Sequence, residues 1–175
     1  ECRQHNERVV SWIQANRPNR VYMIAAWFAW ANDNEGYALI DSHSGLKGNR
    51  QLFSSSLART LEMIRPHVRE IVIIGPTPGV SASLPYRLAM SKWRQMPEPA
   101  PLERTAFEAR ASNFWDAVRP HAQHVTLVNP GPWFCGPISC RYLTEDGRLL
   151  YRDAHHLSLD GAQFVAAKLA RDSDG

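Results

Sequence analysis

Short apolar runs alternate with longer amphipathic segments along the chain, and this alternation constrains the fold more than any other feature. Three runs predict strands, the first two buried on both faces of a sheet: residues 21–27, 71–74 and 125–128. Apolar residues at helical spacing predict helices over residues 7–15, 52–64, 84–93, 102–118 and 159–171. Residues 147–151 fit a short strand or a hairpin. Strands separated by helices indicate an α/β fold, in which a mostly parallel sheet lies between two layers of helices.

Size and composition indicate one globular domain over residues 1–175. Hydrophobic residues make up 44% of the chain and charged residues 21%, so the chain can form a core without a metal or disulfide. The net charge of +3 is spread along the sequence without a basic run, which argues against a dedicated nucleic-acid binder. The longest near-apolar run, residues 21–31, is too short to cross a bilayer. Because the first residue is Glu1, we expect the domain to be truncated at its N-terminus.

Two cysteines stand close together in the segment FCGPISC. Cys135 and Cys140 are five positions apart, and the intervening Gly136 favours a turn. The pair is therefore either a local disulfide, which we favour, or two free thiols. Zinc is disfavoured because the chain has no second cysteine pair. A disulfide would indicate an oxidising compartment, and we then expect Cys2 to pair upstream of Glu1.

The strongest local signal for chemistry is the segment DAHHLSLDGA, which contains Asp153 and His156. A carboxylate three residues before a histidine in one tight turn can hydrogen-bond the imidazole, which fixes its tautomer and leaves the other nitrogen as a base. Ser158 fits the N-cap of the helix that follows. The alternative for such a pair is a surface turn with a solvated histidine. Adjacent side chains in an extended stretch point to opposite sides, so we do not expect His155 and His156 to share a metal ion.

This segment resembles the last conserved block of SGNH hydrolases, which reads Asp-x-x-His and leads into a closing helix. The closer similarity is to the SGNH domain fused after the membrane acyltransferase-3 domain of bacterial O-acetyltransferases. Three further segments are similar in order: VYMIAAWFAW, SLARTLEMIRPHVREIVIIGPTP, and FCGPISC followed by GRLLYRDAHHLS. Together they cover most of the chain. The resemblance implies a flavodoxin-like SGNH fold in which Asp153 orients His156 and His156 is the general base.

The chain departs from this family at the nucleophile. The family's first block is a strand ending in Gly-Asp-Ser, and nothing before Val21 fits it. The serine is therefore expected upstream of Glu1. A rival is Ser42 in the string IDSHS, which mimics the block without its glycine; the alternative for Ser42 is an ordinary loop residue. The oxyanion hole is not identified, although Asn32 and Asn34 are candidates.

The resemblance implies an SGNH-type acyltransferase that O-acetylates a cell-surface polysaccharide, such as an O-antigen, peptidoglycan or a similar glycan, by a Ser/His/Asp acyl-enzyme mechanism. A secreted carbohydrate acetyl-esterase and a non-catalytic glycan-binding domain remain alternatives. The expected partners are a glycan acceptor, an acetyl donor and an upstream membrane acyltransferase-3 domain, which would tether this domain to the inner membrane in the periplasm. We expect no cofactor, no metal and no nucleic acid. Four tryptophans could line a sugar groove or simply pack in the core: Trp27, Trp30, Trp93 and Trp133.

Overall fold

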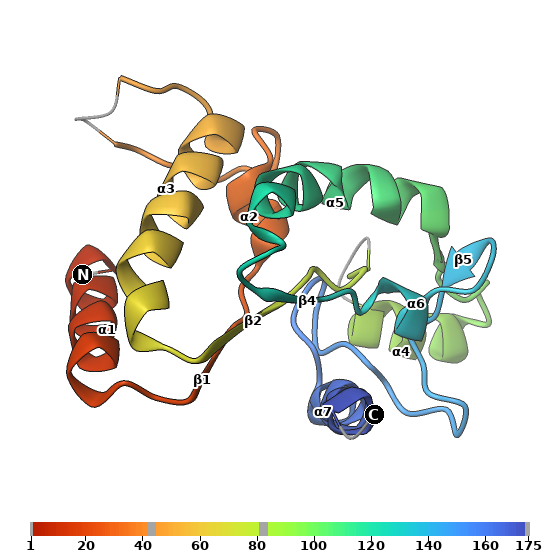
Figure 1. The fold of residues 1–175 in the computed structure, drawn as a ribbon. Helices are drawn as coiled ribbons and strands as arrows, with labels where there is room; N and C mark the ends of the chain where they lie inside the picture. The colour runs from red at the N-terminus through yellow and green to blue at the C-terminus, as the bar shows by residue number, and fades with distance from the viewer. Residues whose placement is uncertain (1, 42–44, 81–83, 174–175) are drawn as a thin grey trace. The chain divides into compact units, whose positions relative to one another are not determined.

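Three parallel strands form the larger sheet: β1 (Arg20–Met23), β2 (Glu70–Ile74) and β4 (Thr126–Val128), in that spatial order. The structure is a computed structural model that describes residues 2–41, 45–80 and 84–173 (Figure 1). The registers pair Val21 with Ile71 and Ile73 with Leu127. A mixed α/β fold with a parallel sheet is thus confirmed.

The chain divides into two compact units. The first holds the parallel sheet and comprises Glu1–Pro76 and Arg110–Asn129, and the second comprises Thr77–Ala109 and Pro130–Gly175. This division does not decide whether residues 1–175 fold as one domain, so the single domain stays a prediction.

Four helices contribute to the first unit: α1 (Cys2–Asn16), α2 (Trp27–Ala31), α3 (Asn49–Ile64) and part of α5 (Arg104–Val118). α1 and α2 each pack against α3. Short 3-10 turns follow α3 and α5, each with a proline that ends the preceding helix: η1 (Arg65–His67) and η2 (Arg119–His121). The core is formed by Ile13, Trp27, Ala31, Phe53, Leu57, Leu61, Ile64, Ile71, Ile73, Phe114, Ala117 and Val118.

Gly75, directly after β2, shows why this core requires a glycine there. A Cβ at this position would lie 2.5 Å from the ring of Trp115 and 3.3 Å from the carbonyl oxygen of Val128. The backbone N–H of Gly75 also donates to that carbonyl at 2.9 Å, which extends the β2–β4 pairing by one residue. The close approach of ring and backbone therefore depends on the missing side chain.

The first predicted strand is partly wrong. The strand ends at Met23, and Trp27 opens the short helix α2 instead of closing a strand. β1 pairs with β2 alone among the described strands, and exposed and partly buried residues alternate along it, with Tyr22 49% exposed, so this strand is not buried on both faces. The apolar character of residues 27–31 comes from a helical face, which buries Trp27, Phe28 and Ala31.

The second unit contains α4 (Leu84–Arg94), α6 (Gly131–Phe134), α7 (Leu159–Ser173) and a small antiparallel pair, β3 (Leu102–Glu103) with β5 (Ser139–Cys140). Its core is formed by Leu84, Phe134, Tyr142, Leu150, Tyr151 and Val165. The helix expected from residue 102 begins at Arg104, because the two preceding residues pair with β5.

The remaining predicted elements are confirmed; their ends shift by at most about three residues, except that the helix expected from residue 7 begins at Cys2. Residues 147–151 take part in hairpin-like bridges, Leu143 with Leu149 and Tyr151 with Leu157. Within the described residues, no helix is both long and apolar enough to span a bilayer.

Candidate active site

Residues 152–156 of the second unit form a tight turn that is closed by its own hydrogen bonds. Oδ1 of Asp153 accepts the backbone N–H groups of His155 at 3.0 Å and of His156 at 2.8 Å. The N–H of Arg152 donates to the carbonyl of His156 at 2.9 Å. The turn anticipated from the Asp-x-x-His spacing is present, with the aspartate at its centre.

Asp153 and His156 also meet through their side chains. Oδ2 of Asp153 lies 2.8 Å from Nδ1 of His156. Burial raises the pKa of Asp153, but hydrogen bonds from the N–H groups of His155 and His156 and from the His156 ring outweigh it, so the pKa falls well below its ordinary value. An ionised carboxylate only accepts hydrogen bonds, so Nδ1 of His156 carries the proton. In the neutral tautomer of this ring the lone pair is on Nε2, which has no hydrogen-bond partner among the described residues.

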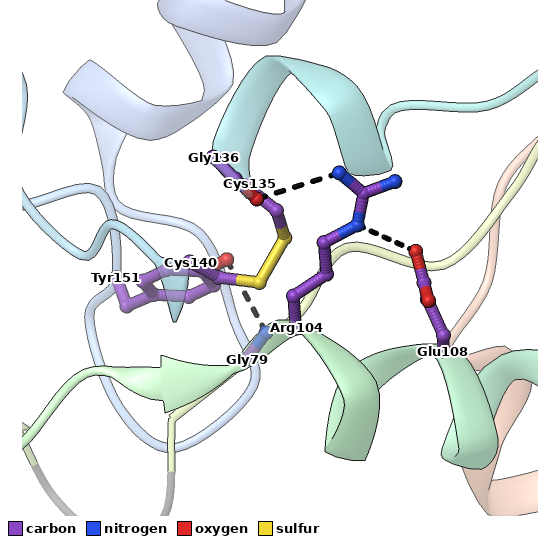
Figure 2. The surroundings of a disulfide bond; sticks show 7 residues. All are labelled: Gly79, Arg104, Glu108, Cys135, Gly136, Cys140 and Tyr151. Carbon is purple, nitrogen blue, oxygen red and sulfur yellow. Dashed lines mark hydrogen bonds and ion pairs between the residues drawn. A yellow bond between two sulfur atoms is a disulfide. The ribbon is translucent and has the colours of Figure 1, made fainter. Parts of the chain in front are cut away.

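Tyr151, directly before the turn, holds it against residues 79–80. Its side chain is fully buried, and its hydroxyl oxygen accepts the backbone N–H of Gly79 at 3.2 Å (Figure 2). Burial raises the pKa of this phenol, so it stays neutral at physiological pH. The N–H of Val80 donates to the carbonyl of Ala154 at 2.7 Å. Two contacts thus fix the turn to residues 79–80, and sequence reasoning identified neither.

The start of α7 holds the other end of the turn. The N–H of Gly161 donates to Oγ of Ser158 at 3.0 Å, which confirms Ser158 as the N-cap. The same hydroxyl donates to the carbonyl of Leu149. A Cβ on Gly161 would lie 2.0 Å from the carbonyl oxygen of Leu150, so the helix approaches this strand-like segment closely only because residue 161 is glycine.

His155 lies beside His156, contrary to the expectation that their side chains diverge. The two ring centroids are 4.3 Å apart, because the backbone turns here and is not extended. Asp153, His155 and His156 each offer a possible ligand atom, all within 4.8 Å of one another. All three side chains are at least a third exposed, and the absence of a metal from the function stays a prediction.

The other candidate residues take different places. Asn32 is buried in the first unit, where its amide donates to the carbonyls of Phe28 and Arg110 and its oxygen accepts from Asn113. Its donors are occupied within the fold, which argues against a role in an oxyanion hole. Asn34 is exposed, and Ser42 lies outside the described residues.

The four tryptophans named as possible sugar-binding residues differ in burial. Trp27 is buried, and its Nε1–H donates to the carbonyl of Ile74 at 2.6 Å. Trp30 and Trp133 are partly buried against the cores of the first and second units, respectively. Trp93 is 75% exposed on α4.

Cys135 and Cys140 form a disulfide, as favoured from the sequence (Figure 2). The N–H of Gly136 donates to the carbonyl of Ser139 at 2.9 Å inside the small loop that the bond closes. Arg104 connects this loop to the start of α5, because its N–H donates to the carbonyl of Ile138 at 2.8 Å. The disulfide and the Asp153–His156 pair belong to the same compact unit.

Comparisons with known proteins agree with this architecture. The periplasmic domain of the lipopolysaccharide acetyltransferase of Salmonella ser. Paratyphi A has a similar structure, with a TM-score of 0.63 and 19% sequence identity. The match covers 97% of this chain but 62% of that domain, so the chain spans less than two thirds of its relative. No curated protein matched the sequence. A family model described as the SGNH domain fused to AT3 domains matches residues 1–171, and the chain therefore belongs to this SGNH family.

Proposed function

We propose that the chain is the SGNH domain of an O-acetyltransferase that modifies a cell-surface polysaccharide. The observation that carries the proposal is the 2.8 Å hydrogen bond between Asp153 and His156, on a turn fixed from both sides, in a member of the SGNH family. The structural relative is a domain of a lipopolysaccharide acetyltransferase, which supports an O-antigen or a related glycan as the acceptor.

The geometry fits a base that acts through Nε2 of His156. A serine hydroxyl attacks the carbonyl carbon of an acetyl ester or thioester while Nε2 takes the serine proton. The leaving group receives that proton as the tetrahedral intermediate collapses to an acetyl-serine. A sugar hydroxyl then gives its proton to Nε2 and attacks the acetyl group, and the proton returns to the serine as it leaves. Throughout, the ionised Asp153 holds the ring by Nδ1 and stabilises the imidazolium.

We place the nucleophilic serine on a segment that precedes residue 1. Along β1, the edge away from β2 has no strand partner among the described residues. Such an edge can accept a further strand. Ser42 is the alternative nucleophile within the chain.

We also propose an extracytoplasmic location. The Cys135–Cys140 disulfide fits an oxidising compartment. The family is fused to AT3 domains, and the structural relative is periplasmic, which supports tethering to the inner membrane through an upstream acyltransferase-3 domain. The partners would be the acetyl donor and the glycan acceptor.

An acetyl esterase is the second candidate, and one observation favours it. The side chain of His156 is 55% exposed, so water has access to this imidazole in the present chain. In a transferase, the acceptor or another domain must exclude that water.

The test uses the full-length protein, with acetylation of its glycan and release of free acetate measured together. Replacing His156 with alanine should reduce turnover by about 10²- to 10⁴-fold, because the base is lost. His155→Ala is the matched control, since it removes the neighbouring imidazole but keeps the backbone N–H that holds Asp153. Unchanged turnover in His156→Ala would refute the assignment, and acetate release without glycan acetylation would favour the esterase.

A further inference from the structure

α4 has two opposite faces, and both carry apolar side chains. One face packs into the core of the second unit through Leu84 and Leu88. On the other face, Tyr86 is 64% exposed and Trp93 is 75% exposed. Two exposed aromatic rings on the same side of one helix form an apolar patch, and such patches mark interaction surfaces more often than single exposed residues do.

The two exposed rings form a stripe with Met90 between them. Tyr86, Met90 and Trp93 stand at spacings of i, i+4 and i+7 and therefore lie on one side of the helix, where the rings are exposed and Met90 is partly buried. Met96, two residues beyond the end of α4, is 56% exposed. Helical geometry of 3.6 residues per turn places this stripe opposite Leu84 and Leu88.

Cations stand on both sides of the helix. Helical geometry puts Arg87 and Arg94 along one border of the stripe, and the exposed Lys92 on the other side of the helix, closer to Leu88 than to Trp93. The guanidinium of Arg94 lies 5.3 Å from the ring centroid of Trp93. The sequence from residue 84 to residue 96 contains no aspartate or glutamate, so no carboxylate of this segment offsets its positive charge.

We propose that the outward face of α4, defined by Tyr86, Trp93 and Met96 with Arg87, Lys92 and Arg94, docks onto an anionic lipid surface. Tryptophan and tyrosine favour the boundary between acyl chains and headgroups, and flanking lysine and arginine pair with lipid phosphates. Sugar-binding sites commonly combine aromatic rings with carboxylate or amide side chains, and residues 84–96 hold no carboxylate and one amide, Gln95, beside three cations, which favours the lipid surface. Docking through this face does not depend on the proposed acetyl transfer.

The test measures co-sedimentation of the 175-residue chain with vesicles. Phosphatidylcholine vesicles containing phosphatidylglycerol should bind the chain, pure phosphatidylcholine vesicles should bind it weakly, and added salt should release it. Replacing the three α4 cations by glutamine should weaken binding about fivefold per cation, hence roughly a hundredfold together. Trp93→Ala should weaken binding about tenfold through loss of buried apolar area.

Two matched controls separate this face from net charge and from general hydrophobicity. A triple glutamine variant at the exposed Arg8, Lys47 and Arg171 lowers the net charge of +3 by the same amount and should bind like the parent. Trp12→Ala removes a tryptophan that is 57% exposed on α1 and should also bind like the parent. Circular dichroism confirms that each variant is folded.

Three results would overturn the proposal. The first is no binding to anionic vesicles at low salt, and the second is equal loss of binding in the α4 and control variants. The third is binding to a soluble anionic oligosaccharide that disappears with Trp93→Ala while vesicles stay unbound, which would assign the face to a glycan instead.

Discussion

The two units differ in where they place polar side chains. In the first unit, Asn32 and Asn49 are 6% and 3% exposed, and their amides bind backbone carbonyls. In the second unit, Asp153 and His156 are substantially exposed, while the tyrosine that supports their turn is fully buried. Buried amides fix the course of a loop, whereas an exposed acid–base pair on a buried support is available to a substrate. We therefore expect the buried asparagines of the first unit to govern stability, and Asp153 and His156 of the second unit to govern turnover.

The largest effect should come from Asp153→Asn in the full-length protein. Turnover should fall by about 10²- to 10⁴-fold, because an amide neither orients the Nδ1–H tautomer reliably nor stabilises the imidazolium. The midpoint of thermal unfolding should fall only modestly, since an amide oxygen still accepts the N–H groups of the turn but lacks the charge that favours the folded state at neutral pH. Steady-state kinetics measure the expected loss of turnover, and a melting curve measures the expected change in stability. A large fall in melting temperature with normal turnover would show that Asp153 serves stability and not catalysis.

Next in size is Gly161→Ala, which alters the buried support of the pair. The new Cβ would stand 2.0 Å from the carbonyl oxygen of Leu150, so the backbone must shift, and we expect a loss of about 3 kcal/mol in the free energy of unfolding. Gly136→Ala is the control, because its Cβ would meet its nearest neighbour at 3.8 Å. Urea unfolding measures both, and equal stability of the two variants would contradict the close approach at Gly161.

A similar or slightly smaller loss is expected from Asn49→Ala in the first unit. Nδ2 of Asn49 donates to the carbonyls of Asn32 at 2.9 Å and Tyr37 at 2.7 Å, and Oδ1 accepts the N–H of Leu39 at 2.8 Å. Leaving these groups without partners should cost about 2 to 3 kcal/mol. Turnover per folded molecule should remain at the parent level, and a selective loss of turnover would show that this network serves the site.

The smallest predicted effect is the change in folding stability at acidic pH. Because the pKa of Asp153 is lowered on folding, its ionised form favours the folded state above the ordinary value of 3.8, and this contribution disappears as pH falls through the lowered pKa. The stability difference between the parent and Asp153→Asn should therefore shrink in strong acid. Urea unfolding at a series of acidic pH values tests this, and a difference that grows toward low pH would contradict the lowered pKa.

The sequence predicted the long helices and the buried strand well, because their apolar periodicities are clear. It misassigned residues 24–27 to a strand and did not predict α2, since a short run of apolar residues fits a buried strand and a buried helix equally. β3 and β5 were missed because their pairing joins Leu102 to Cys140, which no local pattern reveals.

For the site, the sequence spacing predicted the local hydrogen bond, but it did not predict the tertiary contacts that support the turn. Asp-x-x-His predicted the hydrogen bond because both groups belong to one turn. The roles of Tyr151 and Gly161 depend on contacts with Gly79 and Leu150 that only the folded chain creates. The prediction that the side chains of His155 and His156 diverge was wrong, because it assumed an extended backbone. The catalytic roles of Asp153 and His156 stay predictions.

The disulfide also bears on how the chain matures. Among the cysteines of this sequence, Cys135 and Cys140 stand nearest to each other, five positions apart, so joining them requires the least ordering of an unfolded chain. The native bond is thus the pairing that chance encounters form most often, and it can form before the rest of the chain folds. Oxidative maturation of this segment should therefore need little help from a disulfide isomerase.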